Sequence, residues 1–303
     1  MTDQAVAHRV ELEMDEGVAP EVPVRSDMTL KMRLSCACGC DLSGAALRLI
    51  TEEDVVALSG SSAFAVKAPG RLGPCSWVVV FPCQEIGGAV HEQVSLPITF
   101  VTRPLASSLA IWDVPSPVVI GGRFRVKVGA KSSGACALTG APVELLDGAG
   151  TVVGSGHLGD VPWEGTTALY WTDVELTAPL NEGIVSWSAR FAPTDTEVPH
   201  DEAAASFSFA AVRPPDHQLT ITLIEKDTEK PIENAHIRLG AFRTLTDACG
   251  MAHLAMPKGT YEVKVWHAAY ETAPTTVDVM DDVHLQLVGV AVPEEDPSAR
   301  WMM

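Results

Sequence analysis

The chain has 303 residues, of which 47% are hydrophobic, so it is long enough for two or three domains that each bury a core. Its 21 Lys and Arg against 39 Asp and Glu give a formal net charge of -18, which repels nucleic acid and anionic membrane surfaces. No stretch reaches the roughly 18 to 20 apolar residues that span a bilayer, and the first residues do not form a secretory signal. We expect no nucleic-acid partner, no membrane insertion and a cytoplasmic location.

The first predicted elements are two strands. Leu30, Met32 and Leu34 alternate with polar residues, the period of a strand with one buried face. A second strand is predicted at the end of the segment 40–49 (CDLSGAALRL). Because 24 Gly and 21 Pro interrupt the chain every few residues, the short alternating runs between them favour strands over helices. The sequence therefore predicts an all-β fold.

Three closely spaced cysteines, Cys36, Cys38 and Cys40, lie between these two strands. If the first strand continued through them, their side chains would share one face at spacings of about 6 to 7 Å. Such a face could hold a soft metal ion or a labile disulfide, so these three residues are the candidate metal ligands. The spacing lacks the Cys-x-x-Cys turn with which zinc sites usually bring two sulfurs to one ion. The favoured interpretation is therefore structural, reduced cysteines and no cofactor.

The same pattern occurs twice more along the chain. The segments 136–145 (CALTGAPVEL) and 230–239 (KPIENAHIRL) align with 40–49 without gaps, and an alternating apolar run precedes each. Three apolar positions recur at identical spacing in the three segments. They are Leu42, Leu47 and Leu49, then Leu138, Val143 and Leu145, then Ile232, Ile237 and Leu239.

Tryptophans and prolines extend the repeat. Trp77 and Trp187 each begin an apolar run, and an Arg-Pro pair follows each at the same distance, at Arg103 and Arg213. Proline biases its predecessor away from helix and stiffens an extended linker, so these pairs are predicted boundaries. The prediction is three tandem immunoglobulin-like β-sandwich domains, at residues 1–105, 106–213 and 214–303.

The second domain contains additional residues. The interval between Leu138 and Trp187 exceeds the corresponding interval of the first domain by about 14 residues, which we assign to an insertion at 152–172. This segment holds Trp163, Tyr170 and Trp171, and exposed aromatic residues in loops are frequent interface hot spots. These three are candidate partner-binding residues. The alternative is that they cap their own sandwich.

The third domain carries a recognisable set of turns. Thr246-Asp-x-x-Gly250 is followed by a short strand and then by Pro257-x-Gly259-x-Tyr261. Gly250 can adopt the positive φ of a tight turn, and the Asp of the first motif can bond to its own turn backbone. This arrangement, over most of about 75 residues, resembles the carboxypeptidase-regulatory-like family and its transthyretin-like relatives. The resemblance implies a seven-stranded sandwich that serves as a spacer, a stabilising appendage or an adhesive surface.

The end of the sequence and the histidines supply the remaining candidates. An acidic spacer leads to Trp301, Met302 and Met303, which we expect to dock into a groove of a partner or of a neighbouring domain. Histidines recur on predicted strands of the third domain, where two of them could converge, although a row of surface histidines is the favoured interpretation. They are His236, His253, His267 and His284.

The sequence contains no nucleophile elbow, phosphate-binding loop or His-Glu-x-x-His motif. We therefore predict a non-catalytic scaffold or accessory subunit that makes protein-protein contacts within a larger assembly. One alternative is a structural or adhesive protein of the cell surface, exported by a route that needs no N-terminal signal. The other is a metal- or redox-active protein built on Cys36, Cys38 and Cys40.

Overall fold

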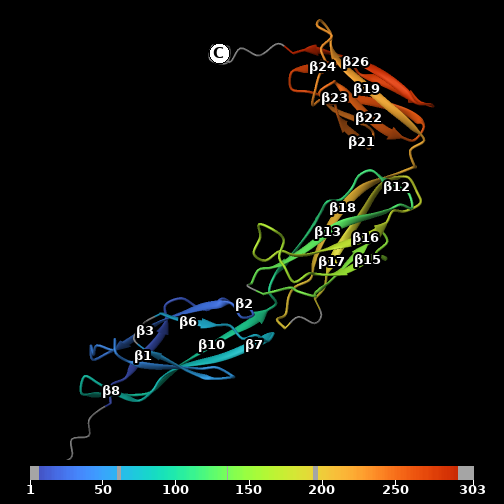
Figure 1. Cartoon of the computed structure of the whole chain (residues 1–303). Coiled ribbons are helices and arrows are strands. Elements are labelled where there is room, and N and C mark those ends of the chain that lie inside the picture. Colours follow the sequence, from blue (N-terminus) through green and yellow to red (C-terminus); the bar gives the residue numbers. More distant parts are fainter. Residues whose placement is uncertain (1–6, 60–62, 135, 194–196, 293–303) are drawn as a thin grey trace, which may run out of the picture.

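The computed structural model describes residues 7–59, 63–134, 136–193 and 197–292. These residues form 26 β-strands and no helix, arranged in three successive pairs of sheets (Figure 1). We call the pairs module one (β1–β10), module two (β11–β18) and module three (β19–β26). The predicted all-β fold of three tandem immunoglobulin-like β-sandwiches is confirmed.

Module one packs a three-stranded sheet, in the order β1-β3-β6, on a five-stranded sheet, in the order β2-β10-β7-β4-β5. The chain changes sheets between β1 and β2, and β2 then pairs parallel with the last strand, β10. A small hairpin, β8-β9, lies between β7 and β10. The strands are β1 (Val10–Met14), β2 (Glu21–Pro23), β3 (Asp27–Cys36), β4 (Ala46–Ile50), β5 (Val55–Ser59), β6 (Ala63–Lys67), β7 (Gly73–Phe81), β8 (Gln84–Ile86), β9 (Ala89–His91) and β10 (Val94–Arg103).

Module two repeats the topology of the two packed sheets strand by strand, without an equivalent of the β8-β9 hairpin among its described residues. Its sheets have the orders β11-β13-β16 and β12-β18-β17-β14-β15, and β12 again pairs parallel with the last strand. The internal repeat seen in the sequence therefore reflects a repeated fold. The strands are β11 (Ser107–Trp112), β12 (Val118–Val119), β13 (Arg123–Ser132), β14 (Pro142–Leu146), β15 (Val152–His157), β16 (Tyr170–Thr177), β17 (Gly183–Phe191) and β18 (Ala203–Val212).

Module three has two four-stranded sheets, β22-β19-β26-β24 and β21-β20-β23-β25. In modules one and two, the first strand pairs antiparallel with its neighbour, β1 with β3 and β11 with β13. In module three, the last strand, β26, takes the place of that first strand and runs parallel to β19. Module three has eight strands, one more than the seven implied by the resemblance to the carboxypeptidase-regulatory-like family. They are β19 (His217–Glu225), β20 (His236–Leu239), β21 (Phe242–Leu245), β22 (Met251–Met256), β23 (Gly259–Trp266), β24 (Tyr270–Thr272), β25 (Thr275–Val279) and β26 (Val283–Ala291).

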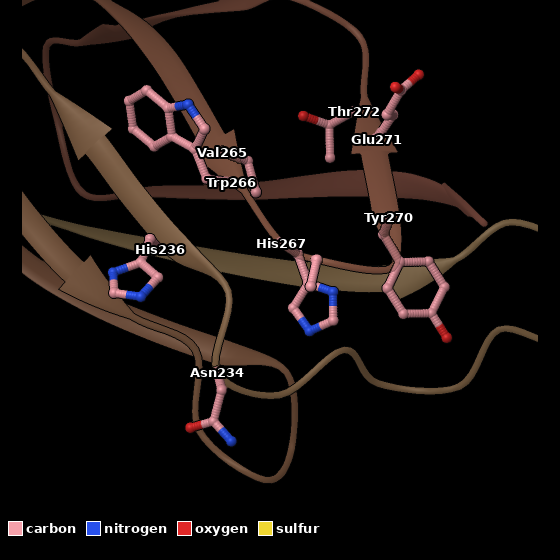
Figure 2. Close-up of a pocket in the computed structure, with 9 residues that line it drawn as sticks. Asn234, His236, Val265, Trp266, His267, Tyr270, Glu271 and Thr272 are labelled. Carbon is pink, nitrogen blue, oxygen red and sulfur yellow. The ribbon is translucent and has the colours of Figure 1, made fainter. Parts of the chain in front are cut away.

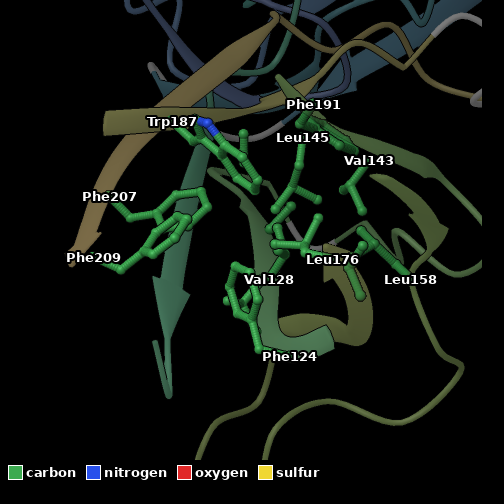
Figure 3. Packing of buried hydrophobic residues seen from close by; sticks show 14 of the residues in the cluster. Phe124, Val128, Val143, Leu145, Leu158, Leu176, Trp187, Phe191, Phe207 and Phe209 are labelled. Carbon is green, nitrogen blue, oxygen red and sulfur yellow. The ribbon is translucent and has the colours of Figure 1, made fainter. Parts of the chain in front are cut away.

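The repeated apolar positions form the cores. All nine are buried, on or just before β4, β14 and β20, each of which lies inside its own sheet. Trp77 and Trp187 are buried as well and contact equivalent phenylalanines edge-on, with ring centroids 4.8 Å from Phe100 and 5.1 Å from Phe209. Figure 3 shows Trp187 and Phe209 packed over Phe124 in module two.

The predicted turns of module three form as expected. Gly250 has φ 70°, and a Cβ atom there would lie 2.6 Å from the carbonyl oxygen of Leu223. The Asp247 carboxylate accepts hydrogen bonds from the N–H groups of Cys249 and Met251, at 2.8 and 2.9 Å. The requirement for a left-handed residue and an acceptor thus explains the Asp-x-x-Gly spacing.

The insertion in module two is shorter than predicted. Residues 152–157 and 170–172 belong to β15 and β16, which correspond to β5 and β6 of module one. The added chain is the loop 158–169, so Tyr170 and Trp171 are strand residues rather than loop residues. Sequence spacing revealed the extra length but could not place its ends, because the flanking strands are themselves rich in glycine and aromatic residues.

A few side-chain contacts join modules one and two. Val24 of module one packs with Leu105 and Val198 at the near end of module two. Arg25 forms an exposed ion pair with Glu197, at 3.0 Å. Module one therefore meets module two through a few side chains beside their linker.

Candidate functional site

The predicted row of three thiols does not form, because β3 ends at Cys36. The Gly39 N–H donates to the Cys36 carbonyl oxygen at 2.8 Å, and Gly39 has φ 73°. This turn brings Cys40 back beside Cys36 and leaves Cys38 exposed to solvent. The cysteine spacing was expected to lack a turn that brings two sulfurs together. Such a turn is present, in a Cys-x-x-x-Cys form that depends on Gly39.

Two histidines from distant segments join the two cysteines. One nitrogen from each of His8 and His91 and the sulfurs of Cys36 and Cys40 all lie within 4.8 Å of one another. The His8 Nδ1 atom is 3.2 Å from the Cys40 sulfur. We call these four residues the Cys/His cluster; the sequence prediction included its cysteines and missed its histidines.

Backbone hydrogen bonds hold the two histidines together. His8 lies just before β1, and His91 is the last residue of β9. The His8 N–H donates to the carbonyl oxygen of Val90 at 2.8 Å, and the Glu92 N–H donates to the carbonyl oxygen of His8 at 2.9 Å. The imidazoles meet edge-on, with ring centroids 5.3 Å apart.

The environment of the cluster is uneven. His91 is 0% exposed, and neither of its ring nitrogens has a hydrogen-bond partner among the described residues. The three other side chains are half-buried. The Cys38 backbone N–H holds the pKa of the Cys36 thiol below its ordinary value, whereas burial and then the neighbouring Cys36 raise the pKa of Cys40.

Module two has the same backbone hydrogen bonds at the equivalent place, with different side chains. We call this shared backbone arrangement the frame. The matching backbone hydrogen bonds show that Leu105 is equivalent to His8 of module one and that His200 is equivalent to His91. The Leu105 N–H donates to the carbonyl oxygen of Pro199, and the Asp201 N–H donates to that of Leu105, at 3.0 and 2.9 Å. The isolated parallel bridges also match, His8 with His91 and Leu105 with His200.

The two cysteines have equivalents too. Ser132 ends β13 as Cys36 ends β3, and Cys136 follows it at the spacing of Cys40. The Ser132 hydroxyl lies 3.0 Å from His200 Nε2, and His200 Nδ1 lies 2.6 Å from the Val198 carbonyl oxygen. Both side chains are buried, so this Ser–His pair is closed to a substrate. We interpret it as a packing contact at the junction of modules one and two.

Three tryptophans of module two gather on the outer face of β11-β13-β16, whereas the predicted contact residue Tyr170 packs against the core. Trp163, from the loop 158–169, lies 5.0 Å from Trp112 and 4.9 Å from Trp171, measured between ring centroids. The Lys127 Nζ atom is 5.9 Å from the centroid of Trp163 and 6.0 Å from that of Trp171. All three indoles are half-buried. We call Trp112, Trp163 and Trp171 the tryptophan cluster.

Module three carries an open depression of about 580 Å³ (Figure 2). His236, Trp266, His267 and Tyr270 surround it, and the centroids of the His267 and Tyr270 rings are 5.1 Å apart. His267 Nδ1 accepts a hydrogen bond from the Ala269 N–H of its own turn. The lining also includes Glu271 and Thr272, so the depression is an open, partly aromatic surface with polar groups around it.

The four histidines singled out in the sequence of module three separate into two pairs. His236 and His267 line the depression, whereas His253 and His284 flank Thr220 across β22-β19-β26. His253 Nδ1 is 3.1 Å from the Thr220 hydroxyl oxygen. The remaining predicted contact residues, Trp301, Met302 and Met303, lie outside the described residues.

No protein-family model matches the chain, and no curated protein is similar to it in sequence. Within the described ranges, no helix is long and apolar enough to cross a membrane.

Solved structures with similar folds include three β-domain proteins. The chain is 12% identical to BcpA, the major pilin subunit of Bacillus cereus, over 82% of this chain and 95% of that one, with a TM-score of 0.24. The ICAM-5 D1–D4 ectodomain fragment shares 13% identity over 93% and 76%, with a TM-score of 0.31. The D00-D0 domain of intimin shares 15% over 67% and 99%, with a TM-score of 0.24. Similarities this low carry no argument about this chain.

Proposed function

We propose that this chain is a non-catalytic structural protein, in which three β-sandwich modules make protein-protein contacts in a larger assembly. The observation that carries the proposal is the tryptophan cluster. It covers the outer face of a sheet whose inner face already packs into the core of module two. Large aromatic side chains that remain half-exposed are the residues that most often dominate interface energies.

The cluster is rigid, which favours binding. Gly129 leaves room for Trp112, because a Cβ atom at this position would lie 2.9 Å from the indole. The Trp163 N–H donates to the Leu169 carbonyl oxygen at 2.7 Å within the loop, and the Gly159 N–H donates to the Trp171 carbonyl oxygen at 2.9 Å, which ties the loop to β16. A preorganised surface loses little conformational entropy on binding.

The surroundings of the cluster indicate the chemistry of its partner. Val161, at the edge of the loop, is 66% exposed. The charge of Lys127 is matched by Asp113 at 2.6 Å and Asp173 at 3.9 Å. An apolar patch bordered by carboxylates fits a partner with an apolar anchor and basic residues around it, as the net charge of -18 also favours.

Affinity capture with quantitative mass spectrometry tests this role. The full chain is compared with Trp163→Ala and with Ile184→Ala, a control that removes a 79%-exposed apolar side chain from β17, in the other sheet of module two. We expect Trp163→Ala to lose a partner that both other proteins retain, because loss of a hot-spot indole weakens binding by about 2 kcal/mol or more. Equal recovery with all three proteins would contradict a contact role for the cluster.

Two finer parts of the proposal concern module three and the tail. The Thr246 and Tyr261 turns support membership of module three in the carboxypeptidase-regulatory-like group, whose domains act as spacers. We propose that Trp301, Met302 and Met303 dock onto a partner. Capture with a chain that ends at residue 292 tests the tail, since unchanged recovery of every partner would remove it from the binding surface.

The location of the protein is proposed as cytoplasmic, with the cell surface as the alternative. Subcellular fractionation separates the two. Recovery of the chain with the cell envelope would turn the proposal toward a surface structural protein, in which the same modules would make adhesive contacts.

A further inference from the structure

We propose that the Cys/His cluster binds one Zn²⁺ ion, which closes the end of module one. The ion would join the segment before β1, the turn after β3 and the end of β9. This site is independent of the protein contacts proposed for module two, because it lies in a different module and shares no residue with the tryptophan cluster.

The donor set and its spacing fit zinc. Two thiolates and two imidazoles are a common ligand set of structural zinc sites. Zn–S distances of about 2.3 Å and Zn–N distances of about 2.0 Å place the ligand atoms of a tetrahedral site about 3.3 to 3.8 Å apart. The four ligand atoms here lie within 4.8 Å of one another, and His8 Nδ1 and the Cys40 sulfur are already 3.2 Å apart. Small side-chain rotations bring the set to tetrahedral geometry.

The buried histidine is a second observation that points to a ligand. His91 is 0% exposed, and both of its ring nitrogens lack a hydrogen-bond partner among the described residues. Burying an imidazole without a partner costs free energy, and native proteins rarely leave such groups unsatisfied. Coordination of an ion beside Cys36 and Cys40 satisfies one of these nitrogens.

Module two shows how the same frame is stabilised without an ion. There, His200 has the Ser132 hydroxyl at 3.0 Å and the Val198 carbonyl oxygen at 2.6 Å, and Leu105 supplies an apolar side chain. Module one replaces Ser132 with Cys36 and Leu105 with His8. Cysteine and histidine are good zinc ligands, whereas serine and leucine are not. A thiol is also a weaker hydrogen-bond partner than a hydroxyl for the buried histidine.

The arrangement indicates a structural role for the ion. Four protein ligands complete a tetrahedral shell, whereas catalytic zinc sites keep a position for water or substrate. The ligands come from three segments that are far apart in sequence, so binding closes long loops and stabilises the fold. We therefore expect the ion to fix the N-terminal segment rather than to perform chemistry.

Metal titration of the reduced, full-length protein tests the site. After removal of metal with a chelator, Co²⁺ is added and then displaced with Zn²⁺. We expect one equivalent of Co²⁺ to give the visible bands and thiolate charge-transfer absorption of a tetrahedral site, and one equivalent of Zn²⁺ to abolish them.

Variants identify the ligands. His8→Gln and Cys40→Ser are expected to weaken binding by about 100-fold or more, since even loss of an outer-shell contact costs 10- to 100-fold. Two controls, Cys38→Ser beside the cluster and Cys136→Ser at the equivalent position of module two, should bind as the unchanged protein does. Circular dichroism checks that each variant is folded. No uptake by the unchanged protein, or loss of binding in Cys38→Ser, would overturn the proposal.

Hydrogen exchange provides a readout that does not depend on variants. Zn²⁺ should slow exchange of the His8 and Glu92 amides, which bridge the N-terminal segment and β9. The equivalent amides of module two, on Leu105 and Asp201, should not respond. A Cys36–Cys40 disulfide in the protein as isolated from cells, with no bound metal, would also overturn the zinc site.

Discussion

The ends of modules one and two share one backbone frame but close it by different means. In module one the frame carries the Cys/His cluster, and its buried His91 has no hydrogen-bond partner among the described residues. In module two Leu105 packs with Val24 and Val198, and His200 contacts Ser132. A sandwich end can thus be closed by apolar packing against a neighbour or, as we propose, by an ion.

This comparison shows where the repeat has diverged. The core positions changed only among apolar residues, because each must fill the same space between two sheets. The frame residues changed in chemical type, from hydroxyl to thiol and from aliphatic to imidazole. The difference lies at the end of the sandwich, where the next module or a ligand can supply what the core does not.

The largest expected effect comes from Leu105→Ala. Leu105 is 4% exposed in the junction cluster, so its truncation should destabilise module two by about 2 to 5 kcal/mol. The matched change in module one, His8→Ala, should cost less than about 1 kcal/mol in metal-free protein, because His8 is half-buried and contributes no apolar packing of this kind. Guanidinium unfolding, followed by hydrogen exchange of peptides from each module, measures both. Equal losses of stability in Leu105→Ala and His8→Ala would contradict the proposed difference between the two modules.

Much of the fold was predictable because its information is local. Period-two alternation placed strands such as β3 and β13, and the identical spacing of Leu47, Val143 and Ile237 identified β4, β14 and β20. The position of β26 was not predictable in this way. Its parallel pairing with β19 joins the two ends of module three, and no local pattern specifies such a pairing.

The candidate metal site was only half predictable for a similar reason. Cys36 and Cys40 are neighbours in sequence, whereas His8 and His91 meet through a long-range parallel bridge. The thiol row was wrong because Gly39 ends the strand with a left-handed turn, which the alternation rule ignores. Past the tryptophans, His91-Glu92 and His200-Asp201 fall one residue out of register, and a one-residue gap that aligns them could have drawn attention to the buried histidine.

Zinc itself should give the next largest effect. At a free Zn²⁺ concentration 100 times the Kd, binding to the native state should stabilise module one by about 2.7 kcal/mol. Module two has no such ligand set among its described residues, so its stability should not change. Denaturant unfolding at fixed free Zn²⁺ and in excess chelator measures the shift. Equal stabilisation of both modules would indicate nonspecific binding.

Ser132→Ala should have an intermediate effect on module two. The change removes the hydroxyl 3.0 Å from His200 Nε2 in a buried site, which should cost about 1 to 3 kcal/mol. Ser107 pairs with Ser132 across β11 and β13, and its buried hydroxyl has no hydrogen-bond partner among the described residues. Ser107→Ala is therefore a matched control that should be neutral or slightly stabilising. Thermal unfolding of the two variants compares them, and a neutral Ser132→Ala would show that His200 does not depend on this contact.

The smallest expected effect concerns the ion pair that crosses the junction. The side chains of Arg25 and Glu197 are 49% and 85% exposed, so solvent screens their attraction and their side-chain entropy opposes it. Arg25→Ala should therefore change stability by less than about 1 kcal/mol, and added salt should reduce the difference further. Unfolding at low and at high salt measures it. A loss as large as that of Leu105→Ala would mean that charge, rather than the packing of Leu105 against Val24, holds the two modules together.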